Sequence, residues 1–216
     1  MKISESTIAV LQNFQGINSA IVLKPGDVIK TLSDDKTVMG EAKVPETFGT
    51  EFGIYDLASF LNTLGVLGED AELNFTPESV AMENGGFKVS YRGCKPNLIT
   101  HPPENHSFST ENKHFEFTLE ENDLKKFLKL ASMNSLKHIV MEVRDKKVFL
   151  GANDGTDTSS FIEREVGSAD CENLSLTFLT QHFKMVPKSY TVEVTPIFVK
   201  FTSEDGNLVY YIVAQA

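Results

Sequence analysis

The sequence predicts an α+β protein of two similar domains, each with its helices on one face of antiparallel sheet. Three observations favour this class. Short segments typical of β-strands fill most of the 216 residues, four helical patterns interrupt them, and a stretch rich in Pro, Asn, Ser and His divides the chain near its middle. The length allows one large domain or two of about 100 residues, and either can bury a core.

Nine short segments are typical of β-strands. Turn residues separate them, so neighbouring segments are expected to pair as antiparallel hairpins. The segments are SAIVL, DVIKTL, AELNFT, FKVSY, HIVMEV, KVFLGA, YTVEV, FVKFT and LVYYIVA, and the turn signals include PGD (25–27), SDDK (33–36), ENGG (83–86) and EDGN (204–207).

The first two helical patterns lie in the N-terminal half. The first runs from about Glu5 to Gln15, with Ser4 as the expected N-cap and Gly16 as the residue just beyond the end. The second covers 56–67 and repeats apolar residues at helical spacing. Its apolar positions are Leu57, Phe60, Leu61, Leu64 and Leu67.

The other two helical patterns lie in the C-terminal half. One falls within LEENDLKKFLKLASMNSLKH (119–138), and Thr118 with Glu121 three residues on predicts a capping box that opens it. The last is short, within TQHFKMV (180–186), and Pro187 ends it. The apolar stripe of the third helix consists of Leu124, Phe127, Leu128 and Ala131.

A unit of strand, helix and several strands recurs four times. Each helix follows a short apolar stretch, and the centres of these stretches are 51, 63 and 61 residues apart; they lie near Ile3, Ile54, Phe117 and Phe178. Four units of one kind predict two similar domains of two units each.

The domain boundary is expected in GCKPNLITHPPENHSFSTENKH (93–114), where turn-forming and polar residues replace the β pattern. The prediction is an N-terminal domain of residues 1–97, an exposed connector of 98–113 and a C-terminal domain of 114–216.

The charge balance argues against a protein that coats nucleic acid with its whole surface. The chain has 20 Lys and Arg against 30 Asp and Glu, a formal net charge of −10. Divided after residue 110, the first part carries 8 basic against 14 acidic residues, net −6, and the second 12 against 16, net −4. Any basic surface must therefore come from the arrangement of a few residues on one face.

The sequence also predicts a cytoplasmic location. No run of 18 apolar residues is present, and Ser, Glu and Thr interrupt the apolar residues of the N-terminus. Two cysteines, Cys94 and Cys171, are too few for a disulfide framework and are typical of a reducing compartment.

Sequence motifs of the common enzyme classes are absent. The chain has no G-x-S-x-G, no G-x-x-x-x-G-K-S/T, no H-E-x-x-H and no C-x-x-C. An enzyme would need a site assembled from scattered residues. We therefore expect no catalytic activity, no cofactor and no metal.

The third helix gathers lysines on its polar side, which is unusual in an acidic chain. Two interpretations are open: a solvated face in which Glu121 pairs with Lys125 four residues on, or a local surface for phosphates. The second is favoured by the helix at 56–67, which has no charge between Asp56 and Glu69, and by the lysines near the fourth helix.

Four stretches resemble the sliding clamps of T-even-type bacteriophages, the processivity factors of the phage DNA polymerases. They are NFQGINSAIVLKPGDVI (13–29), GIYDLASFLNTLGVL (53–67), HFKMVPKSY (182–190) and NLVYYIVAQA (207–216). The resemblance touches both halves and implies the DNA clamp fold, with three chains of two domains closing into a six-domain ring around duplex DNA. Further partners that it implies are the replicative DNA polymerase and an ATP-dependent clamp loader, in the cytoplasm of the infected host cell.

The resemblance also implies which residues face DNA without sequence specificity. By position these are Lys125, Lys126, Lys129, Lys137, Lys184 and Lys188. The first helix departs from the family pattern, because its polar positions include Glu5 and Gln12 where basic residues are expected. We therefore assign no DNA contact to that helix.

A hydrophobic pocket for short peptides of the polymerase and other replication proteins is also implied, between the domains and under the connector. The candidates are Leu98, Ile99, Tyr211 and Val213, although the last two could be ordinary core or edge residues of the final strand. Edge strands are the natural candidates for subunit pairing. Two alternatives to a clamp remain at this point: a β-rich structural or interaction protein that forms no ring, such as a monomeric accessory subunit or virion component, and an uncharacterised enzyme.

Overall fold

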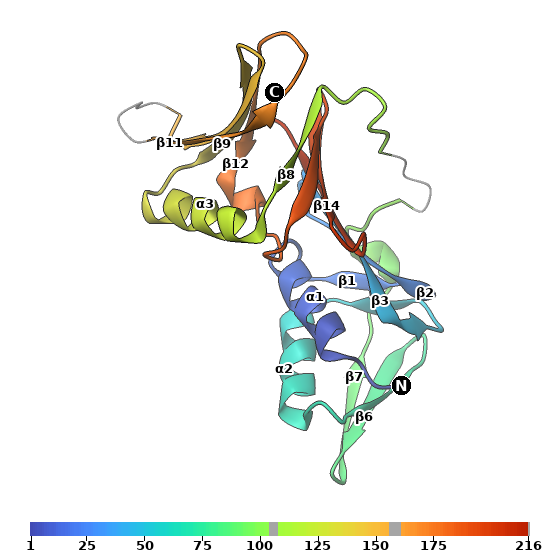
Figure 1. Cartoon of the computed structure of the whole chain (residues 1–216). Helices are drawn as coiled ribbons and strands as arrows, with labels where there is room; N and C mark the ends of the chain where they lie inside the picture. The colour runs from blue at the N-terminus through green and yellow to red at the C-terminus, as the bar shows by residue number, and fades with distance from the viewer. Residues whose placement is uncertain (104–107, 156–160, 216) are drawn as a thin grey trace. The chain divides into compact units, whose positions relative to one another are not determined.

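The computed structural model of the chain describes residues 1–103, 108–155 and 161–215 (Figure 1). The chain divides into two compact units, Met1–His106 and Ser107–Ala216, which are considered one at a time. Each unit combines antiparallel strands with helices, as the sequence predicts. None of the helices in the described residues is both long and apolar enough to cross a bilayer.

Unit 1 contains two α-helices and seven strands among its described residues. Its strands form the pair β1-β4, the pair β2-β3 and the sheet β5-β6-β7, all antiparallel. The elements in order are α1 (Glu5–Gln15), β1 (Ile21–Leu23), β2 (Gly26–Leu32), β3 (Val38–Phe48), β4 (Phe52–Ile54), α2 (Leu57–Leu67), β5 (Glu72–Phe75), β6 (Ser79–Asn84), β7 (Phe87–Arg92) and the 3-10 helix η1 (Pro96–Leu98).

Helix α1 begins and ends where the sequence predicts. The hydroxyl of Ser4 accepts a hydrogen bond from the backbone N–H of Thr7 at 3.3 Å, which confirms the N-cap. The ring of Phe14 is fully buried against β3, where Gly40 leaves room for it: a Cβ added to Gly40 would lie 2.7 Å from the ring. This glycine therefore allows the helix to approach the strand closely.

Strand β3 was absent from the predicted segments, because Gly40 and Pro45 interrupt its pattern. The structure shows how Pro45 is accommodated. Gly26 pairs with Phe48 but Val28 pairs with Lys43, so the register shifts and Pro45 lies in the irregular part. A proline is tolerated there because no ladder N–H is required of it.

The stretch around Ile3 is not a strand, unlike the other three apolar stretches that precede helices. Ile3 is nevertheless buried, and Met1 exchanges backbone hydrogen bonds with Leu73 of β5, each of 2.7 Å. The N-terminal residues thus cover the outer edge of β5.

Unit 2 repeats the arrangement with a single long helix. One sheet has the order β11-β10-β9-β12 and the other strands run in the order β15-β14-β13-β8. Its elements are β8 (Phe115–Leu119), α3 (Glu121–Met133), β9 (His138–Arg144), β10 (Lys147–Asn153), β11 (Phe161–Ser168), β12 (Leu174–Leu179), the 3-10 helix η2 (Thr180–His182), β13 (Tyr190–Val194), β14 (Phe198–Ser203) and β15 (Leu208–Val213).

The predicted capping box of α3 is wrong. Thr118 belongs to β8, and the N-cap residue is Glu120, whose side chain makes no capping hydrogen bond. Ser189, which follows η2 in the chain, supplies the cap instead: its hydroxyl accepts from the backbone N–H of Glu121 at 3.1 Å. The acceptor for the N–H at the helix start thus comes from a segment distant in sequence, so no local sequence pattern could indicate it.

The predicted fourth helix is present as the single 3-10 turn η2. Each of the four helical segments is followed by three strands, and a strand precedes all but the first. The recurring unit read from the sequence is therefore confirmed for three of its four copies, and the first copy lacks the leading strand.

Candidate nucleic-acid interface and partner-binding residues

Helix α3 buries one side and exposes a stripe of mainly polar residues on the other. Leu124, Phe127 and Ala131 are buried, at most 5% exposed. The opposite side is marked by residues spaced four, three and four apart, which align along one face of a helix. These exposed residues are Asn122, Lys126, Lys129 and Met133.

Lysines 126 and 129 occupy the middle of this stripe, whereas Lys125 lies on its flank. Lys125 forms an ion pair with Glu121, as the solvated-face interpretation expects. Within the described parts of the chain, Lys126 and Lys129 have no carboxylate partner. The positive charge of α3 that is available to a ligand is therefore concentrated on these two side chains.

The remaining predicted lysines lie around η2. Lys137 is exposed, and its backbone carbonyl accepts from the N–H of Thr180 at 2.9 Å, which places it beside η2. Lys184 is exposed just after η2. Lys188 pairs with Asp205 at 2.9 Å.

Asp205 is a strongly held partner for Lys188. A hydrogen bond from the Ser203 hydroxyl, followed by that from Lys188 and one from the backbone of Asn207, holds the pKa of the Asp205 carboxyl well below its usual range. This aspartate stays ionised near neutral pH, so part of the charge of Lys188 is neutralised within the chain.

The helices of unit 1 contribute no positive charge. Neither α1 (ESTIAVLQNFQ) nor α2 (LASFLNTLGVL) contains a lysine or arginine. Glu5 and Gln12 are exposed on α1, and Ser59 and Asn62 are exposed on α2. The helix surface of unit 1 is thus neutral to acidic, and the basic helix belongs to unit 2.

The two partner-site candidates of unit 1 have different environments. Leu98 ends η1 and is 66% exposed. Ile99 is only 5% exposed and packs in a small cluster with Ala20 and Val22. Of the two, Leu98 offers an apolar side chain to a ligand.

The two candidates of unit 2 lie on the solvent-facing side of β15. Tyr211 and Val213 are half-buried and alternate with the fully buried Tyr210 and Ile212, so they are not core residues. Val213 lies opposite Phe198 of β14 in the antiparallel register. The four candidates divide between the two units, and the pocket that would unite them stays a prediction.

One aromatic residue near Tyr211 was missing from the predicted site. Phe108, in the predicted connector, packs on Tyr211 with ring centroids 4.8 Å apart and an interplanar angle of 31°. The only sequence signal was a single aromatic residue in a polar stretch, which does not indicate a partner.

Among the residues that the structure describes, no group of three His, Cys, Asp or Glu side chains is placed to hold a metal ion.

Solved structures with this fold define the class of protein. A chain of the PCNA2-PCNA3 complex of Sulfolobus tokodaii superposes with a TM-score of 0.71 at 13% identity, over 100% of this chain and 99% of that one. A chain of the A. fulgidus PCNA structure bound to the C-terminal region of FEN-1 gives 0.73 at 12% identity, over 100% and 97%. The DNA polymerase III subunit beta of Pseudomonas aeruginosa superposes with a TM-score of 0.70 at 11% identity. The superposition covers 98% of this chain but 63% of that longer chain. The fold is the DNA clamp fold.

Sequence relatives identify the family within that class. The sliding clamp of Vibrio phage KVP40 is 32% identical over 202 residues, 91% of each chain, and the sliding clamp of Enterobacteria phage T4 is 26% identical over 197 residues, 88% of this chain and 85% of that one. The family described as DNA polymerase processivity factor matches residues 2–89. The chain belongs to the sliding clamp family of T4-like phages. Its function is that of a DNA polymerase processivity factor, not of an enzyme.

Proposed function

We propose that three copies of this chain close into a six-domain ring around duplex DNA and tether the replicative DNA polymerase of the phage to its template. The observation that carries the proposal is the 32% identity to a phage sliding clamp over 91% of both chains. An ATP-dependent clamp loader opens the ring, and the protein acts in the cytoplasm of the infected host cell.

The charge distribution suits a ring that must hold DNA and still move along it. Tight phosphate contacts would oppose movement, so closure of the ring replaces affinity. Three chains of net charge −10 carry −30 together, which discourages binding of DNA from outside. A few lysines per chain attract phosphates weakly and without sequence preference.

The DNA-facing residues are proposed to be Lys125, Lys126, Lys129, Lys137, Lys184 and Lys188. The ion pairs among the described residues indicate that these six lysines contribute unequally to the attraction of DNA. Lys126 and Lys129 project from the middle of the exposed stripe of α3, whereas Lys125 and Lys188 each have a carboxylate partner. We expect Lys126 and Lys129 to contribute most.

Ring closure is proposed to join edge strand β7 of one copy to edge strand β11 of the next. Both are edges of their sheets with largely exposed side chains. Strand β7 carries Lys88, which pairs with Glu83, and Arg92, a net charge of +2 for the strand. Strand β11 carries Glu163, Arg164 and Glu165, each paired within the chain, a net charge of −1. Edges of opposite charge favour this head-to-tail pairing over pairing of β7 with β7.

The partner-peptide pocket is proposed to include Leu98, Ile99, Tyr211 and Val213. Exposure supports Leu98, Tyr211 and Val213 as contact residues, and burial supports a scaffold role for Ile99. An extended peptide with apolar side chains is the expected ligand.

Light scattering across a concentration series up to tens of micromolar tests the ring. Three chains of 24.0 kDa predict a species near 72 kDa. Reversing the charge of β7 with Lys88→Glu and Arg92→Glu should shift the mass towards the monomer, whereas Lys36→Glu, in the exposed β2–β3 turn, should leave it unchanged. A strict monomer at every concentration, with no stimulation of the polymerase, would favour the non-ring structural or interaction protein instead.

A further inference from the structure

The aromatic site on the outer face of β14 and β15 already has an occupant from the same chain. Phe108 packs on Tyr211 at 4.8 Å and meets Phe198 edge-on, with centroids 5.6 Å apart and an angle of 73°. Phe198 and Tyr211 also contact each other at 5.9 Å. These three rings form an aromatic cluster on the solvent-facing side of the sheet.

Phe108 is less buried than an aromatic residue of the core. Its side chain is 40% exposed, whereas core aromatic residues such as Tyr210 are fully buried. The contacts of Phe108 with Tyr211 and Phe198 are ring on ring, a geometry that another aromatic side chain could reproduce.

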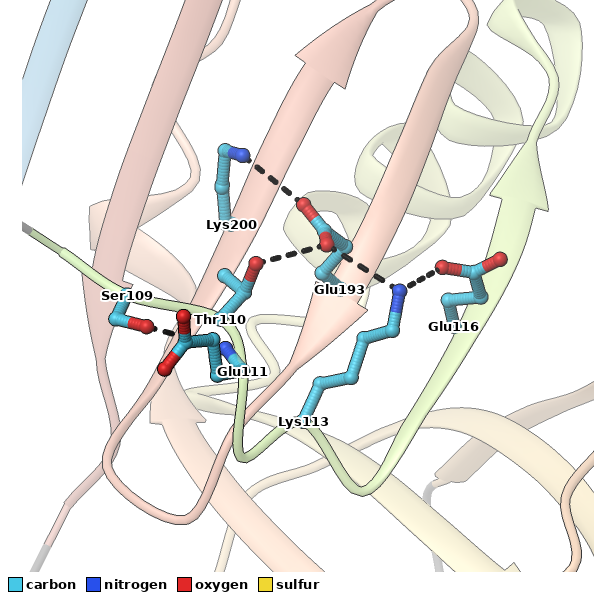
Figure 2. Close-up of polar contacts among 7 residues, drawn as sticks. All are labelled: Ser109, Thr110, Glu111, Lys113, Glu116, Glu193 and Lys200. Carbon is cyan, nitrogen blue, oxygen red and sulfur yellow. Dashed lines mark hydrogen bonds and ion pairs between the residues drawn. The ribbon is translucent and has the colours of Figure 1, made fainter.

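Polar contacts anchor the chain just after Phe108 to the sheet (Figure 2). The hydroxyl of Thr110 donates to Glu193 of β13 at 2.9 Å, and Lys113 reaches the same carboxylate at 3.4 Å while pairing with Glu116. Lys200 of β14 completes the group at 3.0 Å from Glu193. The turn at 110–113 is therefore fixed to the sheet by a shared carboxylate.

Glu193 remains ionised in this position. Burial raises the pKa of its carboxyl, but the hydrogen bonds from Lys200 and Thr110, with the charges of Lys200 and Lys113, lower it below the usual value. Because the anchors begin at Thr110, the ring of Phe108 can leave Tyr211 without breaking any of them.

We propose that Phe108 is an intramolecular competitor for the partner-peptide site: its ring occupies the place on Tyr211 and Phe198 that an aromatic side chain of a partner peptide takes. The inference rests on the proposed function for the identity of the site, and adds a regulatory contact to it. Partner binding then requires the connector ring to leave, so the apparent affinity is reduced by the fraction of chains in which the site is open.

The competitor model predicts tighter peptide binding when the ring is removed. Aromatic pairs of this kind shift an equilibrium by about two- to tenfold. We expect Phe108→Ala to bind a synthetic peptide of the polymerase C-terminus about two- to tenfold more tightly than the unmodified chain, by calorimetric titration. Tyr55→Ala removes an aromatic side chain of unit 1 that is 67% exposed, and should bind as the unmodified chain does. Weaker or unchanged binding by Phe108→Ala would overturn the model, since weaker binding would make Phe108 a wall of the pocket.

A second variant reports by fluorescence whether the ring at position 108 is displaced. The chain contains no tryptophan, so Phe108→Trp introduces a single fluorescent reporter that keeps an aromatic ring at this position. Saturating peptide should move its emission to longer wavelength as the indole is displaced into water. An unchanged or blue-shifted emission would contradict displacement.

The test separates this inference from the proposed function. If neither the unmodified chain nor Phe108→Ala binds the peptide, the competitor model falls. Stimulation of the polymerase on a primed circular template would in that case still support the clamp, because it depends on the ring and on any surface that the polymerase uses.

Discussion

Removing Lys126 and Lys129 together tests whether the exposed stripe of α3 attracts DNA. Both side chains are exposed and have no carboxylate partner within the described residues, so substitution to alanine removes charge without breaking an ion pair there. The matched control is Lys125→Ala on the same helix, because Lys125 is already paired with Glu121. Neither change touches the buried side of the helix, and both variants should unfold at the temperature of the unmodified protein.

The size of the effect follows from the number of charges lost. Unit charges about 8 Å apart attract by about 0.5 kcal/mol in water. Screening at physiological salt lowers this to about 0.2 kcal/mol. Two lysines lost from each of three chains then weaken the attraction by about 1 kcal/mol, or about sevenfold. At the lowest salt concentrations the same loss approaches about 3 kcal/mol, more than a hundredfold.

The assay is polymerase stimulation on a primed circular template with the clamp loader, as a function of clamp concentration and of salt. The double variant should need about sevenfold more clamp for half-maximal stimulation at physiological salt, and the deficit should grow as salt is lowered. The control should need less than about twofold more. Equal behaviour of the two variants, or a deficit that does not change with salt, would refute the assignment of these lysines to DNA.

Three further predictions concern the elements that position the sites, with free energies of unfolding measured in urea at fixed protein concentration. Ser189→Ala should lower the free energy of unfolding by about 1 kcal/mol because it removes the hydroxyl that caps α3, while Thr118→Ala should lower it much less. Equal losses in the two variants would support the capping box of Thr118 instead. Glu193→Gln should cost about 1 kcal/mol at pH 7. Because the pKa of Glu193 is lowered in the folded state, this contribution is fully present above the ordinary value of 4.5 and is lost as the pH falls through the lower folded-state pKa, so a difference that does not shrink as the pH falls below 4.5 would contradict the anchor. Gly40→Ala should destabilise by about 1–3 kcal/mol, because its Cβ would lie 2.7 Å from the ring of Phe14 in α1. The control Gly65→Ala, in open space within α2, should be neutral or stabilising. A neutral Gly40→Ala would show that the ring of Phe14 can move aside.

Much of the fold could be predicted because local patterns and tertiary packing agree. The apolar spacing of α1 and α2 and the hydroxyl of Ser4 specify those helices without reference to the rest of the chain. Strand β11 was not predicted, because its side chains are mostly exposed and show no apolar alternation. Its pairing with β10 fixes its conformation, and pairing depends on residues distant in sequence.

The outward lysine face of α3 could be predicted from the sequence, but most contacts of the candidate residues could not. The spacing along α3 indicated an outward lysine face, and the possible pairing of Glu121 with Lys125 was also visible in the sequence. The pairing of Lys188 with Asp205 and the packing of Phe108 on Tyr211 join segments that only the folded chain brings together.

The most direct test of the clamp function is the length of DNA that the polymerase makes in one binding event. The measurement compares a primed circular template with a short linear duplex template, with the loader present and the unmodified chain added or omitted. A ring that encircles DNA predicts a large gain in product length on the circle and little gain on the linear template, whose ends let the ring slide off. Equal gains on both templates, or strong salt-sensitive binding of the isolated protein to the linear duplex, would contradict a ring that holds DNA by encircling it.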